Sequence, residues 1–178
     1  MGRNQEPNED STAFRTTSLP SQEAKSPDTI SEHLQSIARG AITAVNNRDL
    51  SPRSPAWSSF STNFFNDPDG PAFVTPDSAL KSRLWNYKIM SLSDLMDFHH
   101  TISSACPGYT THIVEMATTN LNEKLGHGQV LVSATTTGIP EGVSRPNLSV
   151  FNFRREEDGR WMCVSLRTLP GLDVCGSL

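Results

Sequence analysis

The sequence predicts an α+β fold in which a curved antiparallel sheet of about four to six strands wraps around three N-terminal helices and encloses a cavity. The prediction depends on a change of period along the chain. Apolar residues recur at helical spacing in the first half, and from Tyr109 onward they alternate with a period of two. The Asp158-Gly159 pair between the last two alternating segments is a strong hairpin signal and favours antiparallel neighbours.

The chain of 178 residues is long enough for one domain with a hydrophobic core. Residues 1–26 are polar and contain one aromatic side chain, Phe14, so they bury too little apolar surface to offset the entropy of ordering. We therefore predict a disordered tail over 1–26, an α+β domain over 27–172 and a loose tail over 173–178. The first segment also lacks the apolar run of a secretory signal.

Three segments are expected to be helical. The first, 27–47, follows a Ser-Pro-Asp start signal and has one apolar face. The second, 52–65, is a short helix opened by proline. The third, 91–106, begins at a serine cap and ends at a Pro-Gly pair. The apolar side of the second helix consists of Trp57, Phe60, Phe64 and Phe65.

Alternating apolar and polar residues predict the strands. The long segments are 109–119, 129–137, 147–155 and 161–168. A further short strand is expected at Trp85–Ile89, where large apolar residues also alternate with other side chains. All of these strands fit a sheet that follows the helices in the chain.

Charge and cysteine content exclude several classes of protein. The formal net charge is −4 without a basic block, so there is no electrostatic footprint for nucleic acid. No apolar run reaches the length of a membrane-spanning helix. The three cysteines are widely spaced, and no Cys/His spacing resembles a zinc site. We therefore expect reduced thiols in a cytoplasmic protein that uses no metal and no redox cofactor.

The order of helix, short helix, helix and four long strands resembles the nuclear transport factor two-like superfamily, including its SnoaL-like branch. Three stretches within residues 27–172 carry the resemblance: AVNNRDL (44–50), CPGYTTHIVEM (106–116) and FNFRREEDGRWMCVSL (151–166). It implies a cone-shaped α+β barrel, a homodimer formed through the sheet and a small hydrophobic ligand. The superfamily includes dehydratases, ketosteroid isomerases and polyketide cyclases, and also members without catalysis.

The end of the first helix departs from the pattern of scytalone dehydratase, a member of this superfamily. In that enzyme a carboxylate lies three positions before the aspartate of the terminal motif; the matching residue here is Asn46, and Asp49 is the later aspartate. Val45 stands where the enzyme has a functional tyrosine. Asn46 and Asp49 either reach a ligand or water, or only close the helix. The dehydratase chemistry is therefore not carried over whole.

His99 lies near the centre of the apolar face of the third predicted helix. Two roles are open for it. It is either a packed residue bonded to a backbone carbonyl, as buried polar groups normally are, or a pocket residue that acts as an acid or base, for which an ordinary pKa of about 6.5 is suited. His100 points away from this face and is expected to be solvated.

His112 is the preferred catalytic residue, because the resemblance places a strand-opening histidine in the pocket. A regular strand puts His112, Val114, Met116 and Thr118 on one face, and Glu115 on the other. His112 could instead lie exposed at the rim without a task. If the opposite face lines the pocket, Glu115 becomes the candidate base and substrate contact, with a pKa raised by burial.

The remaining candidates are expected to bind the substrate, since ligand pockets are largely apolar with a few polar groups. Arg167 either orients a polar ligand or forms an ion pair at the sheet edge. The apolar candidates are Trp57, Phe64, Trp85, Tyr87 and Met96. Most of them would otherwise be plain core residues.

Two functions of different classes fit these patterns. The first is a cofactor-independent isomerase, cyclase or dehydratase that acts on a hydrophobic polyketide- or terpenoid-type metabolite in secondary metabolism. His112, helped by His99 or Asn46, would move the proton. The second is a non-catalytic ligand-binding or dimerisation module, which the lack of a clear carboxylate–histidine pair favours. A third, an adaptor of the nuclear transport type, has only the fold in its favour.

Overall fold

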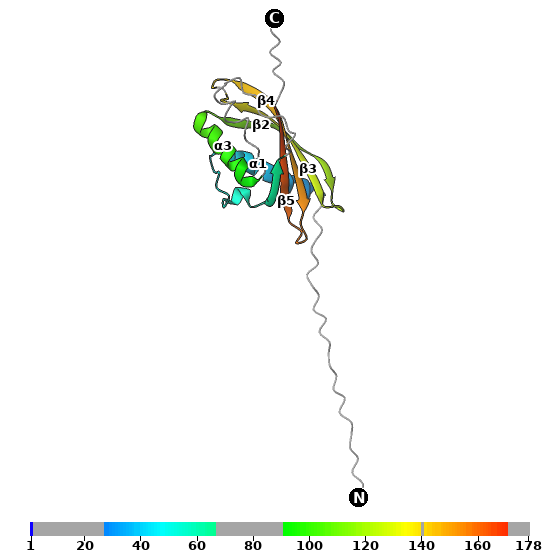
Figure 1. Cartoon of the computed structure of the whole chain (residues 1–178). Helices are drawn as coiled ribbons and strands as arrows, with labels where there is room; N and C mark the ends of the chain where they lie inside the picture. Colours follow the sequence, from blue (N-terminus) through cyan, green and yellow to red (C-terminus); the bar gives the residue numbers. More distant parts are fainter. Residues whose placement is uncertain (2–26, 67–90, 140, 171–178) are drawn as a thin grey trace.

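The computed structural model describes Met1 and residues 27–66, 91–139 and 141–170 (Figure 1). In these ranges the chain forms two α-helices, one 3-10 turn and five strands. In chain order they are α1 (Pro27–Asn46), the 3-10 turn (Pro55–Trp57), β1 (Phe60–Asn66), α3 (Leu92–Ala105), β2 (Thr110–Asn122), β3 (His127–Thr137), β4 (Ser144–Arg155) and β5 (Trp161–Pro170). Figure 1 shows α1 and α3 on the same side of a curved sheet, so the α+β class is confirmed.

The five strands form one sheet in the order β1-β5-β4-β3-β2. Strands β2 to β5 are antiparallel neighbours, as the alternating pattern predicts. Gly159, in the turn between β4 and β5, has a φ of 85°, the left-handed conformation for which an Asp-Gly turn is suited. Strand β1 instead pairs in parallel with β5, with Phe60 opposite Cys163. The sheet is therefore mixed rather than antiparallel throughout.

The prediction of a second helix over 52–65 is wrong. Only residues 55–57 form a single 3-10 turn, and residues 60–66 form β1. The amide of Cys163 donates to the carbonyl of Ser59 at 2.7 Å and brings this segment into register with β5. Pairing in the sheet overrides a local apolar spacing that suits either element. The strand expected at 85–89 lies outside the described residues, and the enclosed cavity stays a prediction.

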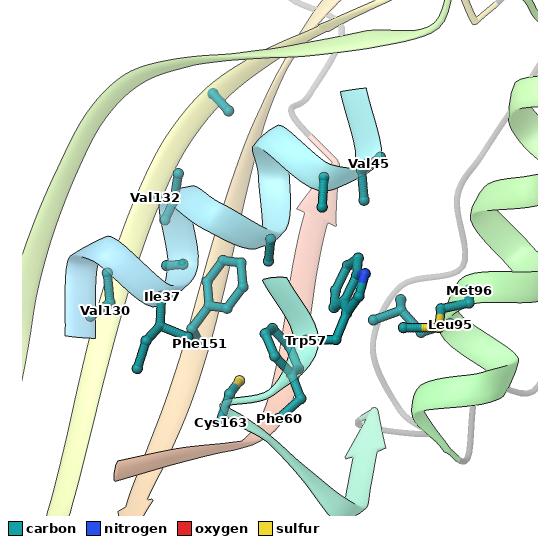
Figure 2. Close-up of a cluster of buried hydrophobic side chains, with 14 of the residues drawn as sticks. Ile37, Val45, Trp57, Phe60, Leu95, Met96, Val130, Val132, Phe151 and Cys163 are labelled. Atoms are coloured by element: carbon teal, nitrogen blue, oxygen red, sulfur yellow. The ribbon is translucent and has the colours of Figure 1, made fainter. Parts of the chain in front are cut away.

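The hydrophobic core lies between the sheet and the two helices (Figure 2). The apolar face of α1 is buried as its periodicity predicts, and Leu34 at its centre is fully buried. Figure 2 shows Trp57 between the residues of α1 and the side chains of Leu95 and Met96 on α3. The sheet contributes mainly Val130, Val132, Ala134, Phe151, Phe153, Trp161 and Cys163.

Close packing of α1 on the sheet depends on Gly128 in β3. A Cβ atom at this position would lie 2.5 Å from Cδ1 of Leu34 and 3.5 Å from the ring of Trp161. The missing side chain therefore lets the helix approach the strand. This contact helps to place the C-terminal end of α1 near the start of β2.

Two bulges in β2 decide which side chains face the helices. The register shifts between Ile113 and Glu115 and again between Thr118 and Asn120. Each extra residue reverses the alternation that follows it. Ile113 and Met116 therefore both pack against the core, and the hydroxyl of Thr118 hydrogen-bonds to Ser31 of α1 at 2.7 Å. The first bulge puts His112 on the face opposite Met116 and Thr118. The expectation that these three residues share one face is therefore wrong.

Candidate functional site

The helix-facing side of the sheet changes from apolar to polar along its strands. On β3, Val130, Val132 and Ala134 are buried, and the next residue on the same side is Thr136. The hydroxyls of Thr136 and Thr111 lie 3.3 Å apart, and the side-chain amide of Asn147 donates to Thr136 at 2.5 Å. Three neighbouring strands thus bring their polar groups together at one end of the sheet.

Further polar residues on the helix-facing side of the sheet lie near these groups and form a polar row with them. Cross-strand partners share a face of the sheet, so Arg145, which pairs with Thr136, lies on the helix-facing side. The Nε atom of Arg145 is buried. The hydroxyls of Ser149 and Thr168 lie 2.9 Å apart on the neighbouring pair of strands. A cation, an amide and several hydroxyls therefore occupy the polar end of the sheet.

Helix α3 adds two polar atoms on its core-facing side. Ser91 caps the helix by accepting a hydrogen bond from the amide of Asp94 at 3.1 Å. His99 and Ser103, one turn apart, lie on the same side of the helix as the buried residues Leu95 and Met96. His99 Nδ1 and Ser103 Oγ are both buried and have no hydrogen-bond partner among the residues that the structure describes. Buried polar atoms are normally paired, so these two are the strongest indication of a ligand-binding site.

Tyr109 connects His99 with the polar row. The two rings are stacked with centroids 6.2 Å apart and an interplanar angle of 23°. Burial raises the pKa of Tyr109, while a hydrogen bond to the side chain of Thr111 and the charge of Arg48 act in the opposite direction. The phenol therefore stays protonated at neutral pH and lies beside the hydroxyl of Thr111.

The protonation of His99 follows from its surroundings. Burial, and then the positive charge of Arg48, lower the pKa of His99 from 6.5 to about 4. The imidazole is therefore neutral at pH 7. Among the described residues, no carboxylate acts on His99 to raise this pKa. The histidine thus differs from one that is paired with an aspartate or glutamate.

Arg48 holds the segment that carries Tyr109. It has a left-handed φ of 62° after the end of α1. Its guanidinium donates to the carbonyls of Pro107 and Tyr109 at 3.0 and 2.8 Å, and to that of Val45 at 3.1 Å. It also lies 5.9 Å from the centre of the Tyr109 ring. Arg48 therefore fixes the turn between α3 and β2 against the end of α1.

Asn46 uses its amide to attach α1 to β2. Its Nδ2 donates to the carbonyl of Thr111 at 2.8 Å, and the amide of Thr111 donates to its Oδ1 at 2.9 Å. The side chain thus continues the hydrogen-bond ladder at the edge strand. Asp49 accepts a hydrogen bond from Ser54 at 2.5 Å, and its backbone carbonyl accepts one from Nε1 of Trp57 at 2.8 Å. The structure gives both residues structural partners.

The structure places His112 and Glu115 on the outer side of the sheet. Both side chains are exposed, and they pair with Thr135 and Ser133 of β3. Nε2 of His112 lies 3.3 Å from the hydroxyl of Thr110. The expectation that His112 faces a pocket under the helices is therefore corrected. Glu115 shares its face with His112 because of the bulge between them, and it is not buried.

The other predicted binding residues are dispersed. Trp57 and Met96 are buried in the core, with 2% and 3% of their surface exposed. Arg167 is exposed on β5, where it pairs with Val150. Phe64 lies in β1, but its side chain is outside the described residues, as are Trp85 and Tyr87 altogether. The structure brings His99 to the polar end of the sheet but not His112, Glu115 or Arg167.

The sequence-based prediction did not identify several residues near the polar end of the sheet. They are Ser103, Tyr109, Thr111, Thr136, Arg145 and Asn147. The hydroxyls of the SATTT segment were explained by β-propensity alone. The available signal was that Thr136 follows Val130, Val132 and Ala134 on the buried face of its strand, where another apolar residue is expected.

The described part of the chain offers neither a metal-binding cluster nor a membrane-spanning helix. Within residues 27–66, 91–139 and 141–170, no group of three or more His, Cys, Asp or Glu residues could hold a metal ion. Neither helix in these ranges has the length and apolar content needed to cross a membrane.

A separate groove of about 480 Å³ runs along α1. It is lined by Glu32, Gln35, Ser36, Arg39, Gly40, Thr43, Ala44, Asn47, Asp49 and Ala56.

Comparison with known proteins supports the fold. No family model matches the chain, and no curated protein matches its sequence. The structure is similar to a domain of unknown function with a cystatin-like fold from Nostoc punctiforme, with a TM-score of 0.55 and 12% identity over 85% of this chain and 82% of that one.

Two further solved structures are similar. One is the hexachlorocyclohexane dehydrochlorinase LinA-type3 from Novosphingobium barchaimii, with a TM-score of 0.55 and 12% identity over 78% of this chain and 84% of that one. The other is a ketosteroid isomerase candidate from Shewanella frigidimarina. Its TM-score is 0.52, with 13% identity over 75% of this chain and 91% of that one. The chain therefore has the nuclear transport factor two-like fold that its sequence resemblance implied.

Proposed function

We propose that the protein is a cofactor-independent isomerase, cyclase or dehydratase that acts on a hydrophobic polyketide- or terpenoid-type metabolite, with His99 as its proton-transfer group. The observation that carries this proposal is the buried Nδ1 of His99, which has no hydrogen-bond partner among the described residues and whose ring stacks on Tyr109. The fold is also that of a dehydrochlorinase and of an isomerase candidate.

The chemistry follows from the low pKa of His99. The neutral imidazole can accept a proton from a substrate carbon or hydroxyl. The imidazolium that forms is unstable in this buried position, near Arg48, so it returns the proton readily. One residue can therefore take a proton from one atom of the substrate and give it to another. Isomerisation, cyclisation and dehydration all need such a transfer.

The polar end of the sheet supplies the binding groups for this reaction. Tyr109, Thr136 and Asn147 present hydroxyl and amide groups that can hold the oxygen atoms of a substrate. The predicted cavity beside the apolar core would take the hydrocarbon part. His112, first in the sequence-based prediction, lies on the outer side of the sheet and has no part in this mechanism.

A non-catalytic ligand-binding or dimerisation module remains the second candidate. It is favoured by the same environment of His99, since none of the described residues is a carboxylate that acts on its pKa. The outer side of the sheet would form the homodimer contact, because Leu131, Leu148 and Val150 lie there only partly buried. Sedimentation of the purified chain would test the dimer.

The function is tested by thermal unfolding with a mixed library of polyketide and terpenoid metabolites. The wild type and His112→Ala should both gain stability with the same compounds, and His99→Ala should lose this gain. Compounds that stabilise the wild type are then incubated with it and analysed for isomerised, cyclised or dehydrated products. Stabilisation that His99→Ala retains in full would contradict the assignment of His99. Binding without turnover would support the module.

A further inference from the structure

Ser103 differs from Thr101, another hydroxyl residue of α3. A serine or threonine inside a helix commonly bonds back to the carbonyl four residues earlier. Thr101 does so, and its Oγ1 donates to the carbonyl of Asp97 at 2.8 Å. Oγ of Ser103 is buried and makes no such bond. Its hydroxyl is therefore available to a group outside the helix.

Ser103 and His99 lie on the same side of α3. The two residues are four positions apart, so they lie one above the other on the helix. Both occupy the face that also carries the buried Leu95 and Ile102, and this face packs on the sheet side. One side of the imidazole is covered by Tyr109. A ligand atom between this helix face and the sheet would therefore lie near both side chains.

We infer that His99 Nδ1 and Ser103 Oγ bind one hydroxyl group of the ligand between them. This inference rests on the proposed function, because it names the part of the substrate that the same site holds. It makes Ser103 a substrate-binding residue and the substrate an alcohol.

The choice of a hydroxyl follows from the hydrogen-bonding properties of the two side chains. If Nδ1 is unprotonated, the ligand O–H donates to it and its oxygen accepts from Ser103. If Nδ1 carries the proton, the ligand oxygen accepts from it and its O–H donates to Ser103. A carbonyl fits only if Nδ1 carries the proton, and its oxygen then accepts from both Nδ1 and the hydroxyl of Ser103. A charged group would also lose its hydration at a buried position, which costs more than for a neutral hydroxyl.

The test uses three probes of the same size: 1-tetralol, 1-tetralone and tetralin, which carry a hydroxyl, a carbonyl and neither. Dissociation constants are measured by NMR titration for the wild type, Ser103→Ala and Thr101→Ala. Removal of a partner from a buried polar group weakens binding roughly 10- to 100-fold. The wild type and Thr101→Ala should therefore bind tetralol at least about 10-fold more tightly than the other two probes, and Ser103→Ala should lose this preference.

The outcomes separate this inference from the proposed function. Equal binding of the three probes to the wild type would overturn the hydroxyl site and leave a binding cavity in place. A preference for tetralol that Ser103→Ala keeps would overturn the role of Ser103. Binding of none of the probes would contradict the hydroxyl site and the proposed pocket together. Ser103→Ala is expected to fold, because alanine removes an unpaired buried hydroxyl and favours the helix.

Discussion

The rings of His99 and Tyr109 are stacked, with centroids 6.2 Å apart and planes at 23°. This contact joins the core-facing side of α3 to the start of β2. Nδ1 of the histidine is buried and has no hydrogen-bond partner in the described part of the chain. A histidine in these surroundings is held in the neutral form, and this property can be measured directly.

The first prediction concerns the pH dependence of stability. The folded pKa of His99, about 4, is lower than the ordinary value of 6.5. The contribution of neutral His99 to the free energy of unfolding is therefore complete above pH 6.5. It is lost as the pH falls from 6.5 to about 4, because the unfolded chain binds the proton first. The loss approaches about 3 kcal/mol at most, since each pKa unit is worth about 1.4 kcal/mol.

Denaturant unfolding between pH 4 and pH 8 measures this loss. His99→Gln should have a shallower decrease in stability on the acid side than the wild type. His112→Gln, which changes an exposed histidine, should follow the wild type. The same acid dependence in His99→Gln and in the wild type would show that other groups cause it.

The second prediction concerns the attachment of α1 to β2. Asn46→Asp keeps an acceptor for the amide of Thr111 but loses the donor to its carbonyl, 2.8 Å away. Two oxygens then face one another, and we expect a loss of about 1–3 kcal/mol in the free energy of unfolding. Asn47→Asp, at the exposed neighbouring position, should change stability by less than about 1 kcal/mol. Equal effects would contradict the role of the Asn46 amide.

The third prediction concerns Arg48. Arg48→Met removes its bonds to the carbonyls of Pro107 and Tyr109 and its charge, but keeps an apolar stem. Stability should fall by about 1–3 kcal/mol. The pKa of His99 should rise, yet stay below 6.5, because burial is the larger cause of its shift. NMR titration of the histidine rings measures the pKa, with Arg53→Met as an exposed control. An unchanged pKa would show that Arg48 does not act on His99.

The fourth prediction concerns the contact of β3 with the turn before β2. Gly138 has a φ of 88°, and a Cβ there would lie 2.5 Å from the backbone of Gly108. Gly138→Ala should therefore destabilise the fold by more than about 2 kcal/mol. Gly142 has a similar φ of 78° but open space around it, so Gly142→Ala should cost only about 1 kcal/mol. Similar losses in the two variants would mean that the close approach is not rigid.

Much of the fold could be predicted from local patterns. The apolar face of α1, the capped α3 and the alternating strands β2 to β5 all have a clear period, and each is found within a few residues of its predicted position. Strand β1 could not be predicted this way. Its phenylalanines have a spacing that suits a helix, and only its pairing with β5, about a hundred residues later in the chain, makes it a strand.

The site was harder to predict than the fold. The expected pocket position of His112 came from the family resemblance, and regular alternation only grouped it with Met116 and Thr118. The bulge after Ile113 interrupts that alternation. Asn46 was left open between a ligand contact and a structural role, and only the position of Thr111 shows its partner. The periodicity of α3 did place His99 on the buried face. The ring that stacks on His99, Tyr109, and the polar end of the sheet lie outside α3, and a single sequence does not show that they meet.

The most direct test of the account is an NMR titration of the histidine ring signals with the compound that best raises the melting temperature. We predict that the ring signals of His99 shift in proportion to binding, while those of His112 stay unchanged. Such a result would place the ligand at the polar end of the sheet. A shift of the His112 signals with no change at His99 would place it on the outer side and contradict the account.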